Sequence, residues 1–151
     1  PLSQAGVVKR AQSSLLAELV GALQLPAAIE FLIDGAGSNI TARTWGYLKV
    51  PFDATVVSAA LLADASGSII VDVWKCTYDQ CDAGATHPVV GDKITASTPP
   101  TLSSATKSLD TTLTGWTTSL DESDVLAFNV PSSATGINRV TLSLNLTRVV
   151  S

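Results

Sequence analysis

The chain has 151 residues, of which 46% are hydrophobic and 15% are charged, and this balance excludes intrinsic disorder and suits one domain with a buried core. No apolar run reaches the roughly 20 residues that a membrane-spanning helix needs, so we expect no membrane insertion. The formal net charge is −4 and the basic residues are scattered, which argues against a nucleic-acid partner because duplex binding needs clustered cations.

Residues 1–26 predict an N-terminal α-helix over about residues 4–24, which Pro26 ends because proline disfavours a helical conformation in the preceding residue. Apolar side chains recur at helical spacing and form one stripe, made of Val8, Ala11, Leu15, Leu19, Ala22 and Leu23. A helix of this length is not stable alone in water. We therefore expect it to serve oligomerisation or anchoring, and we favour packing against other copies over packing on its own domain.

Residues 27–151 predict a β domain, because short runs rich in Val, Ile and Thr are separated by polar turns. The last strand is the clearest, since Val140, Leu142, Leu144 and Leu146 alternate with polar residues as in a half-buried antiparallel strand. Further strands are expected at 29–34, 44–50, 56–62, 68–75 and 125–130, with turns at 35–38 and 63–67.

The stretch 97–119 is crowded with Ser and Thr but keeps recurring Leu and Trp. We interpret it as a strand pair with long loops. Several short strands with turns between them indicate an antiparallel β-sandwich or jelly roll behind the helix.

Few residues suit catalysis, and we expect no enzymatic activity, no cofactor and no metal. His87 is the only histidine and lies in a predicted loop, so a Ser-His-Asp triad has little support. Most acidic residues lie at predicted turns, where Asp serves local hydrogen bonding. Asp72 lies inside an apolar strand, and we expect its side chain on the solvent face. A glycan hydrolase using Asp72 and Asp124 is the least supported hypothesis.

Cys76 and Cys81 are separated by four residues, and three interpretations remain open. A disulfide is favoured if the protein meets an oxidising medium. Two reduced thiols come next. A zinc site is least favoured, because a structural site needs four ligands and only His87 could add a nitrogen.

Three aromatic residues, Trp45, Tyr47 and Tyr78, are candidates for contact with a glycan through ring stacking. We expect Trp45 and Tyr47 to lie on one face of their strand. The alternative, which we favour, is that the tryptophans fill the core or an interface, where aromatic rings bury much area.

Six sequence runs, in order and at similar spacing over about residues 29–148, resemble a small module of tailed-bacteriophage virion proteins. They read IDGAGS at 33–38, GYLKVPF at 46–52, LLADASGSIIVDVWK at 61–75, LTGWTT at 113–118, DVLAFNV at 124–130 and RVTLSL at 139–144. The resemblance implies a jelly-roll β-sandwich, often trimeric, at a tail-fibre tip or on a head or collar appendage, with no catalytic residues. Cys76 and Cys81 depart from the pattern, which suggests an added cross-link in an extracellular particle.

We therefore expect a structural virion protein, made in the host cytoplasm and located in the phage particle. It would be a homotrimeric fibre, collar or capsid-decoration subunit whose N-terminal helix docks to other virion proteins. The alternative is a receptor-binding tail-fibre tip that recognises a host surface glycan.

Overall fold

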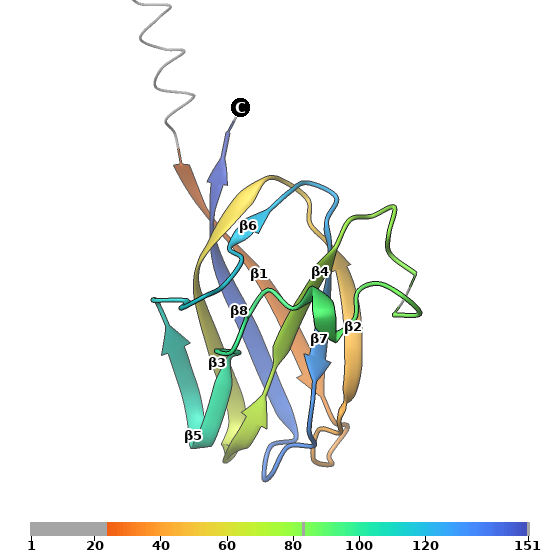
Figure 1. Cartoon of the computed structure of the whole chain (residues 1–151). Helices are drawn as coiled ribbons and strands as arrows, with labels where there is room; N and C mark the ends of the chain where they lie inside the picture. The colour runs from red at the N-terminus through yellow and green to blue at the C-terminus, as the bar shows by residue number, and fades with distance from the viewer. Residues whose placement is uncertain (1–23, 83, 151) are drawn as a thin grey trace, which may run out of the picture.

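The computed structural model describes residues 24–82 and 84–150, and the six residues of the expected helix stripe lie outside these ranges. The described chain forms two antiparallel β-sheets packed face to face (Figure 1). Within these ranges no helix is long and apolar enough to cross a membrane. The strands are β1 (Gln24–Asp34), β2 (Arg43–Lys49), β3 (Ala54–Ile70), β4 (Asp72–Cys76), β5 (Thr101–Asp110), β6 (Ser119–Leu120), β7 (Val125–Val130) and β8 (Arg139–Val149).

The larger sheet has the strand order β1-β8-β3-β5, and the short β6 pairs with the beginning of β3. The smaller sheet has the order β2-β7-β4. Every pairing is antiparallel. The mostly β, antiparallel class expected from the sequence is confirmed for the described residues.

The core lies between the two sheets, and β8 supplies its central row. Val140, Leu142, Leu144 and Leu146 are all buried, so the expected period-two strand is confirmed. Full burial of such a side chain stabilises the fold by about 1.5–3 kcal/mol.

Two aromatic rings join the sheets across this core. Phe31 of β1 stacks on Phe128 of β7, with the ring centroids 4.1 Å apart and the planes inclined by 10°. Gly46 of β2 makes room for this pair, because a Cβ atom there would lie 2.6 Å from the Phe31 ring.

The start of β1 differs from the expectation, because the strand begins at Gln24 and includes Pro26, which pairs with Thr147. Pro26 therefore lies inside a strand and does not mark a helix end. The strand tolerates proline because β1 is at the edge of its sheet, where one side of the backbone needs no partner.

The expected turn at 63–67 is not a break between two strands, because β3 runs without interruption to Ile70. Its pairing with β5 shifts register between Leu62 and Gly67, and both strands bend there (Figure 1). The expected strand 68–75 is wrong as a unit: its first part ends β3 in the larger sheet, and its last part forms β4 in the smaller sheet. At Val71 the chain passes from the larger sheet to the smaller sheet. The alternation of apolar residues continues through this position because both sheets face the same core.

The Ser- and Thr-rich stretch holds one full strand, β5, and then a long connection to the two-residue β6. The expected strand pair is therefore wrong. Two of the recurring apolar residues, Leu113 and Trp116, lie in the connection and are buried against the core. The Trp116 indole Nε1 donates to the Thr98 carbonyl oxygen at 3.0 Å, so a loop supplies part of the core.

The two ends of the sandwich differ. Gln24 at the start of β1 pairs with Val149 at the end of β8, so the chain enters and leaves the sandwich at one end. The loops 35–42 and 131–138 and the bend of β3 lie at the opposite end (Figure 1). We call this second end the distal end.

Candidate functional site

The outer face of the larger sheet exposes leucine side chains from three of its strands. Leu32 of β1 is 54% exposed, Leu62 of β3 is 58% exposed and Leu109 of β5 is 65% exposed. Leu32 and Leu62 lie on either side of Thr141 of β8 in the same cross-strand row. We call this surface the leucine face.

Small side chains lie between the leucines on the leucine face. Ser143 of β8 and Ala60 of β3 pair with each other, and Ala60 also pairs with Leu109. The Ser143 hydroxyl donates to the Glu30 carboxylate at 3.3 Å. A hollow of about 460 Å³ is lined by Ala60, Leu62, Lys107, Ser108 and Leu109. The face therefore combines a shallow apolar hollow with two opposite charges on its edge strands, those of Glu30 and Lys107.

Trp45 does not offer a free ring face for stacking on a sugar. The Arg43 guanidinium carbon lies 3.8 Å from the centroid of its ring, and its indole nitrogen donates to the Thr41 carbonyl oxygen at 3.0 Å. The half-buried ring also packs against the core.

Tyr47 lies beside the loop that follows β4, and Tyr78 lies in that loop. Tyr47 is 42% exposed, and burial of its hydroxyl, with the neighbouring Cys81, raises the pKa of that phenol. Tyr78 is 61% exposed, and the Lys49 ammonium lies 5.3 Å from its ring centroid. A β-bulge between Thr44 and Gly46 interrupts the alternation that would place Trp45 and Tyr47 on one face. The three candidate rings therefore form no common stacking platform in the described chain.

Both cysteines are free thiols in the structure, so the expected disulfide is not formed there. The turn is closed by the backbone instead, because the Cys81 amide donates to the Thr77 and Tyr78 carbonyl oxygens at 3.1 and 3.2 Å. Burial, and then the adjacent Cys81 side chain, raises the pKa of the Cys76 thiol to about 11. Cys76 is therefore a poor nucleophile and a poor metal ligand at neutral pH.

Asp72 is buried and does not lie on the solvent face, which corrects the sequence-based expectation. Its carboxylate pairs with the Lys93 ammonium at 2.6 Å and accepts hydrogen bonds from the Thr95 hydroxyl and the Val73 amide. The long loop after β4 folds back along that strand, where Trp74 forms a bridge with Lys93. This return brings the lysine that makes the burial of Asp72 tolerable.

Asp124 is partnered in a similar way. It forms an ion pair with Lys75 at 3.0 Å and accepts a hydrogen bond from the Asp121 amide at 3.0 Å. Asp72 and Asp124, the two carboxylates of the hydrolase hypothesis, are thus each paired with a lysine.

His87 lies in a loop that Asp82 organises. The Asp82 carboxylate accepts from the Thr86 hydroxyl and from the Thr86 and His87 amides, and these bonds, the Thr86 side chain first, lower its pKa to about 2. The His87 imidazole Nδ1 lies 2.9 Å from the Asp92 carboxylate. This hydrogen bond is the main cause of the lowered pKa of Asp92.

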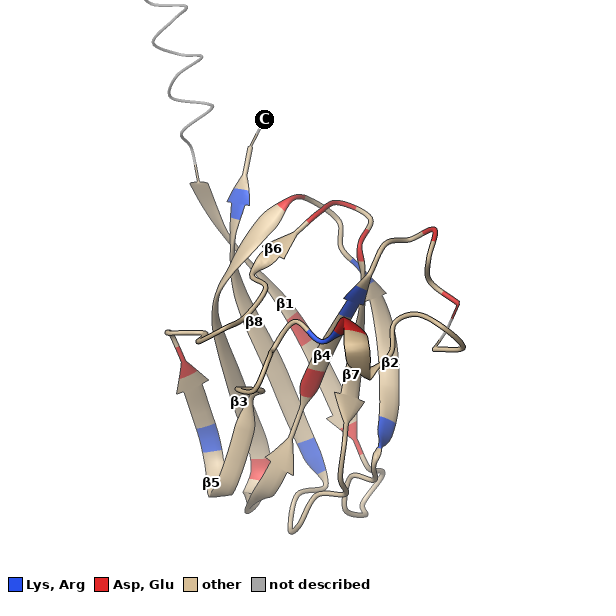
Figure 2. Ribbon diagram, in the orientation of Figure 1, with Lys and Arg blue, Asp and Glu red and all other residues tan. Residues whose placement is uncertain are grey.

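Acidic residues gather in loops at the end where the chain enters and leaves the sandwich (Figure 2). A hollow of about 390 Å³ there is lined by Thr77, Tyr78, Asp79, Asp121, Glu122, Ser123 and Asp124. In the part of the chain that the structure describes, no group of three or more His, Cys, Asp or Glu residues is placed to hold a metal ion.

The leucine face is not among the features expected from the sequence, although the sequence carries a signal for it. Leu32 stands between Phe31 and Ile33, and Leu62 follows Leu61 directly. A strand with one solvated face should show a polar residue at these outward positions. Consecutive apolar residues in otherwise alternating strands therefore indicate a second apolar face.

Neither a family model nor a curated protein gives a significant match to this chain.

Proposed function

We propose that the protein is a structural subunit of a tailed-bacteriophage virion, a trimeric fibre, collar or capsid-decoration protein. The sequence runs that resemble virion modules support the phage assignment. The leucine face is the single observation that carries the assembly role. Large apolar patches on soluble proteins mark interaction surfaces.

We also infer that the sandwich is a jelly roll. In that topology the first strand pairs with the last, and the chain crosses repeatedly between two sheets. The order β1-β8-β3-β5 against β2-β7-β4 supports this inference. A jelly roll has eight long strands. Here the loop after β4 would take the place of one of them, because it forms a bridge with β4 between Lys93 and Trp74.

The leucine face fits other copies of the same chain. Its three leucines are each more than half exposed, so burial between copies would contribute about 1–2 kcal/mol for each one. Glu30 and Lys107 lie on opposite edge strands. If a neighbouring copy placed its β5 beside β1 of the first copy, Lys107 of one copy would pair with Glu30 of the other.

The ends of the chain agree with a parallel trimer. Gln24 and Val149 are paired at one end of the sandwich. Three copies whose leucine faces turn toward a common axis would carry their three N-terminal segments side by side at that end. Residues 1–23 could then dock to other virion proteins, while the distal ends point outward.

The test is the molar mass of the full chain in solution, measured by light scattering and sedimentation equilibrium. We expect a trimer for the unaltered chain and a folded monomer for the double variant Leu62→Glu/Leu109→Glu. The matched control is Val90→Glu, because Val90 is 66% exposed and lies in the loop after β4, outside the larger sheet. A monomeric unaltered chain, or a double variant that remains a trimer, would overturn the assembly role.

A second candidate function, recognition of a host surface glycan, is favoured by a different observation. The aromatic candidates do not support it, since Trp45 is covered by Arg43. A hydroxyl-lined pocket at the distal end does.

A further inference from the structure

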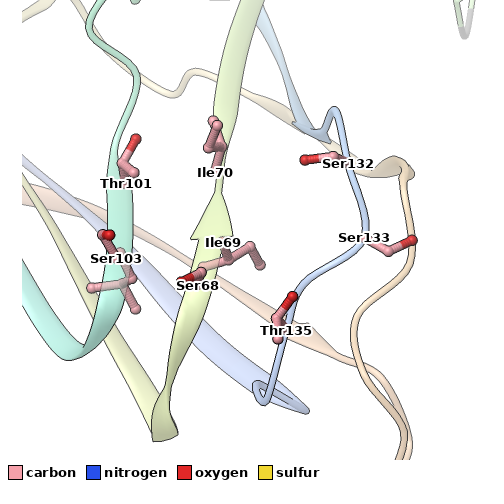
Figure 3. Close-up of a pocket in the computed structure, with 9 residues that line it drawn as sticks. Ser68, Ile69, Ile70, Thr101, Ser103, Ser132, Ser133 and Thr135 are labelled. Carbon is pink, nitrogen blue, oxygen red and sulfur yellow. The ribbon is translucent and has the colours of Figure 1, made fainter.

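The distal end holds a pocket of about 260 Å³ between the end of β3, the start of β5 and the loop 131–138 (Figure 3). It lies at the opposite end from the paired residues Gln24 and Val149 (Figure 1). In the proposed trimer, this end would face away from the particle.

The lining of the pocket is rich in hydroxyl groups. Six of its nine lining residues carry one, namely Ser68, Thr101, Ser103, Ser132, Ser133 and Thr135. The other three are Ile69, Ile70 and Leu102. Ile69 and Leu102 pair with each other and belong to the buried core, whereas Ile70 is half-buried and adds apolar surface to the pocket. None of the nine has an ionisable side chain.

Three of the hydroxyls already serve the fold. The Ser68 hydroxyl accepts from the Ser104 amide at 3.0 Å, and the Thr101 hydroxyl donates to the Pro99 carbonyl oxygen at 2.8 Å. The Ser133 hydroxyl accepts from the Ala42 amide at 3.2 Å.

The hydroxyls of Ser103, Ser132 and Thr135 make no hydrogen bond to any other described residue. Figure 3 shows the Ser132 hydroxyl directed toward β3 and the Ser133 hydroxyl directed away from it. Each free hydroxyl can both donate and accept a hydrogen bond. The pocket thus presents three unused hydroxyl groups, from β5 and from the loop, beside the half-buried Ile70 side chain.

The walls of the pocket are fixed to one another by the backbone. Ser68 and Thr135 exchange two backbone hydrogen bonds, each of 2.9 Å. The contact is so close that a Cβ atom at Gly67 would lie 2.2 Å from the Thr135 carbonyl oxygen. A preformed site of this kind loses little conformational entropy when a ligand binds.

We propose that this pocket binds one neutral sugar unit of a larger glycan. Serine and threonine hydroxyls exchange hydrogen bonds with sugar hydroxyls, and the half-buried Ile70 side chain packs against the C–H face of the ring. The volume is below the range of about 300–1,000 Å³ that drug-sized ligands occupy, which suits a single ring. An acidic sugar would find no countercharge among the lining residues. The inference goes beyond the assembly role and does not depend on trimer formation.

The experiment is binding of the full chain to an array of immobilised oligosaccharides, neutral and uronic-acid-containing, followed by titration of the best neutral binder. We expect selective binding of neutral saccharides. The double variant Ser103→Ala/Thr135→Val should weaken it by about tenfold or more, since it removes two hydrogen-bonding groups at nearly constant volume.

The matched control is Thr106→Val/Ser119→Ala, because both residues are exposed and lie outside the pocket. It should bind like the unaltered chain, and both variants should keep its melting temperature. Absence of saccharide binding, equal binding of acidic saccharides, or unchanged affinity in the pocket variant would overturn the inference.

The molar mass of the same samples separates this inference from the proposed function. A trimer that binds no saccharide would remove the pocket and leave the assembly role. A monomer that binds neutral saccharides would remove the assembly role and leave the pocket inference.

Discussion

At the scale of single residues, burial and local partners set the chemistry of the cysteine pair. Cys76 lies at the end of β4 and is buried, while Cys81 is half-buried in the turn that follows. The neighbouring Cys81 side chain is, after burial, the next cause of the raised pKa of the Cys76 thiol. Both cysteines are free thiols in the structure, and the disulfide in the particle stays a prediction.

The variant Cys81→Ser leaves Cys76 as the only thiol, and we expect it to resist iodoacetamide in the folded protein at pH 8. Burial, the largest cause of the raised pKa of Cys76, remains in this variant, so the thiolate, which is the reactive form, stays a small fraction of the thiol at that pH. The labelling rate should rise about tenfold for each pH unit as the pH approaches the pKa. Mass spectrometry of timed samples measures the rate.

The control for this experiment is Cys76→Ser, whose remaining thiol is less buried and should react faster. Labelling of the unfolded Cys81→Ser protein shows that the reagent is competent. Equal rates for its folded and unfolded forms would contradict the burial argument.

Asp72 shows how a residue's surroundings can reverse its expected role. Its position in β4 alternates with inward-facing Val71 and Val73, and this alternation alone predicts a solvated carboxylate. The loop after β4 returns over it, and the carboxylate pairs with Lys93 and Thr95. The burial is therefore a consequence of a contact 21 residues away, which no local pattern carries.

At the scale of secondary-structure elements, the bend of β3 is the feature on which the distal end depends. It places Ser68 beside Thr135 and lets the chain change sheets at Val71. Gly67 lies at the closest approach of the two segments, where the opposite backbone leaves no space for a Cβ atom.

Gly67→Ala should therefore destabilise the protein by about 1–3 kcal/mol, as overpacking against backbone typically does. The measurement is the free energy of unfolding from urea titration. Gly91→Ala is the matched control, because nothing lies within 4 Å of the Cβ position there. We expect its effect to stay within about 0.5 kcal/mol, the usual range for surface substitutions. A similar loss in the free energy of unfolding for both variants would show that the close approach of Gly67 to Thr135 does not constrain the fold.

At the scale of the whole molecule, the beginning of β1 decides where the chain can be divided. Because β1 starts at Gln24 and pairs with β8 along its whole length, a deletion should remove residues 1–23 and keep Leu25 and Pro26. Deletion to residue 26 would remove part of an edge strand together with the expected helix.

We expect the chain 24–151 to keep its β circular-dichroism spectrum but to dissociate from trimer to monomer at higher concentration than the full chain. The physical reason is that the apolar stripe expected over residues 8–23 would add contacts to those of the leucine face. Sedimentation equilibrium over a dilution series measures this. An identical dissociation curve for both chains would show that the N-terminal segment does not contribute to assembly.

A point-variant version of the same experiment keeps the full chain. Leu15→Glu/Leu19→Glu places two charges on the stripe, whereas Gln12→Glu/Ser13→Glu places two charges off it. We expect only the first pair to weaken association.

The sequence by itself determined what depends on short-range periodicity. The alternation of Val140, Leu142, Leu144 and Leu146 predicts β8 correctly because each side chain's face follows from its neighbours two residues away. The β class and the turn after β1 follow from the same kind of local pattern.

The tertiary structure alone decided which segments meet. Val71 continues the alternation of β3, so the sequence could not show that the chain changes sheets there. The pocket is assembled from residues 68–70, 101–103 and 132–135, and the leucine face from β1, β3 and β5. Such sites arise from pairing between distant strands, and the energy that selects one pairing is spread over the whole core, so no short stretch of sequence contains it.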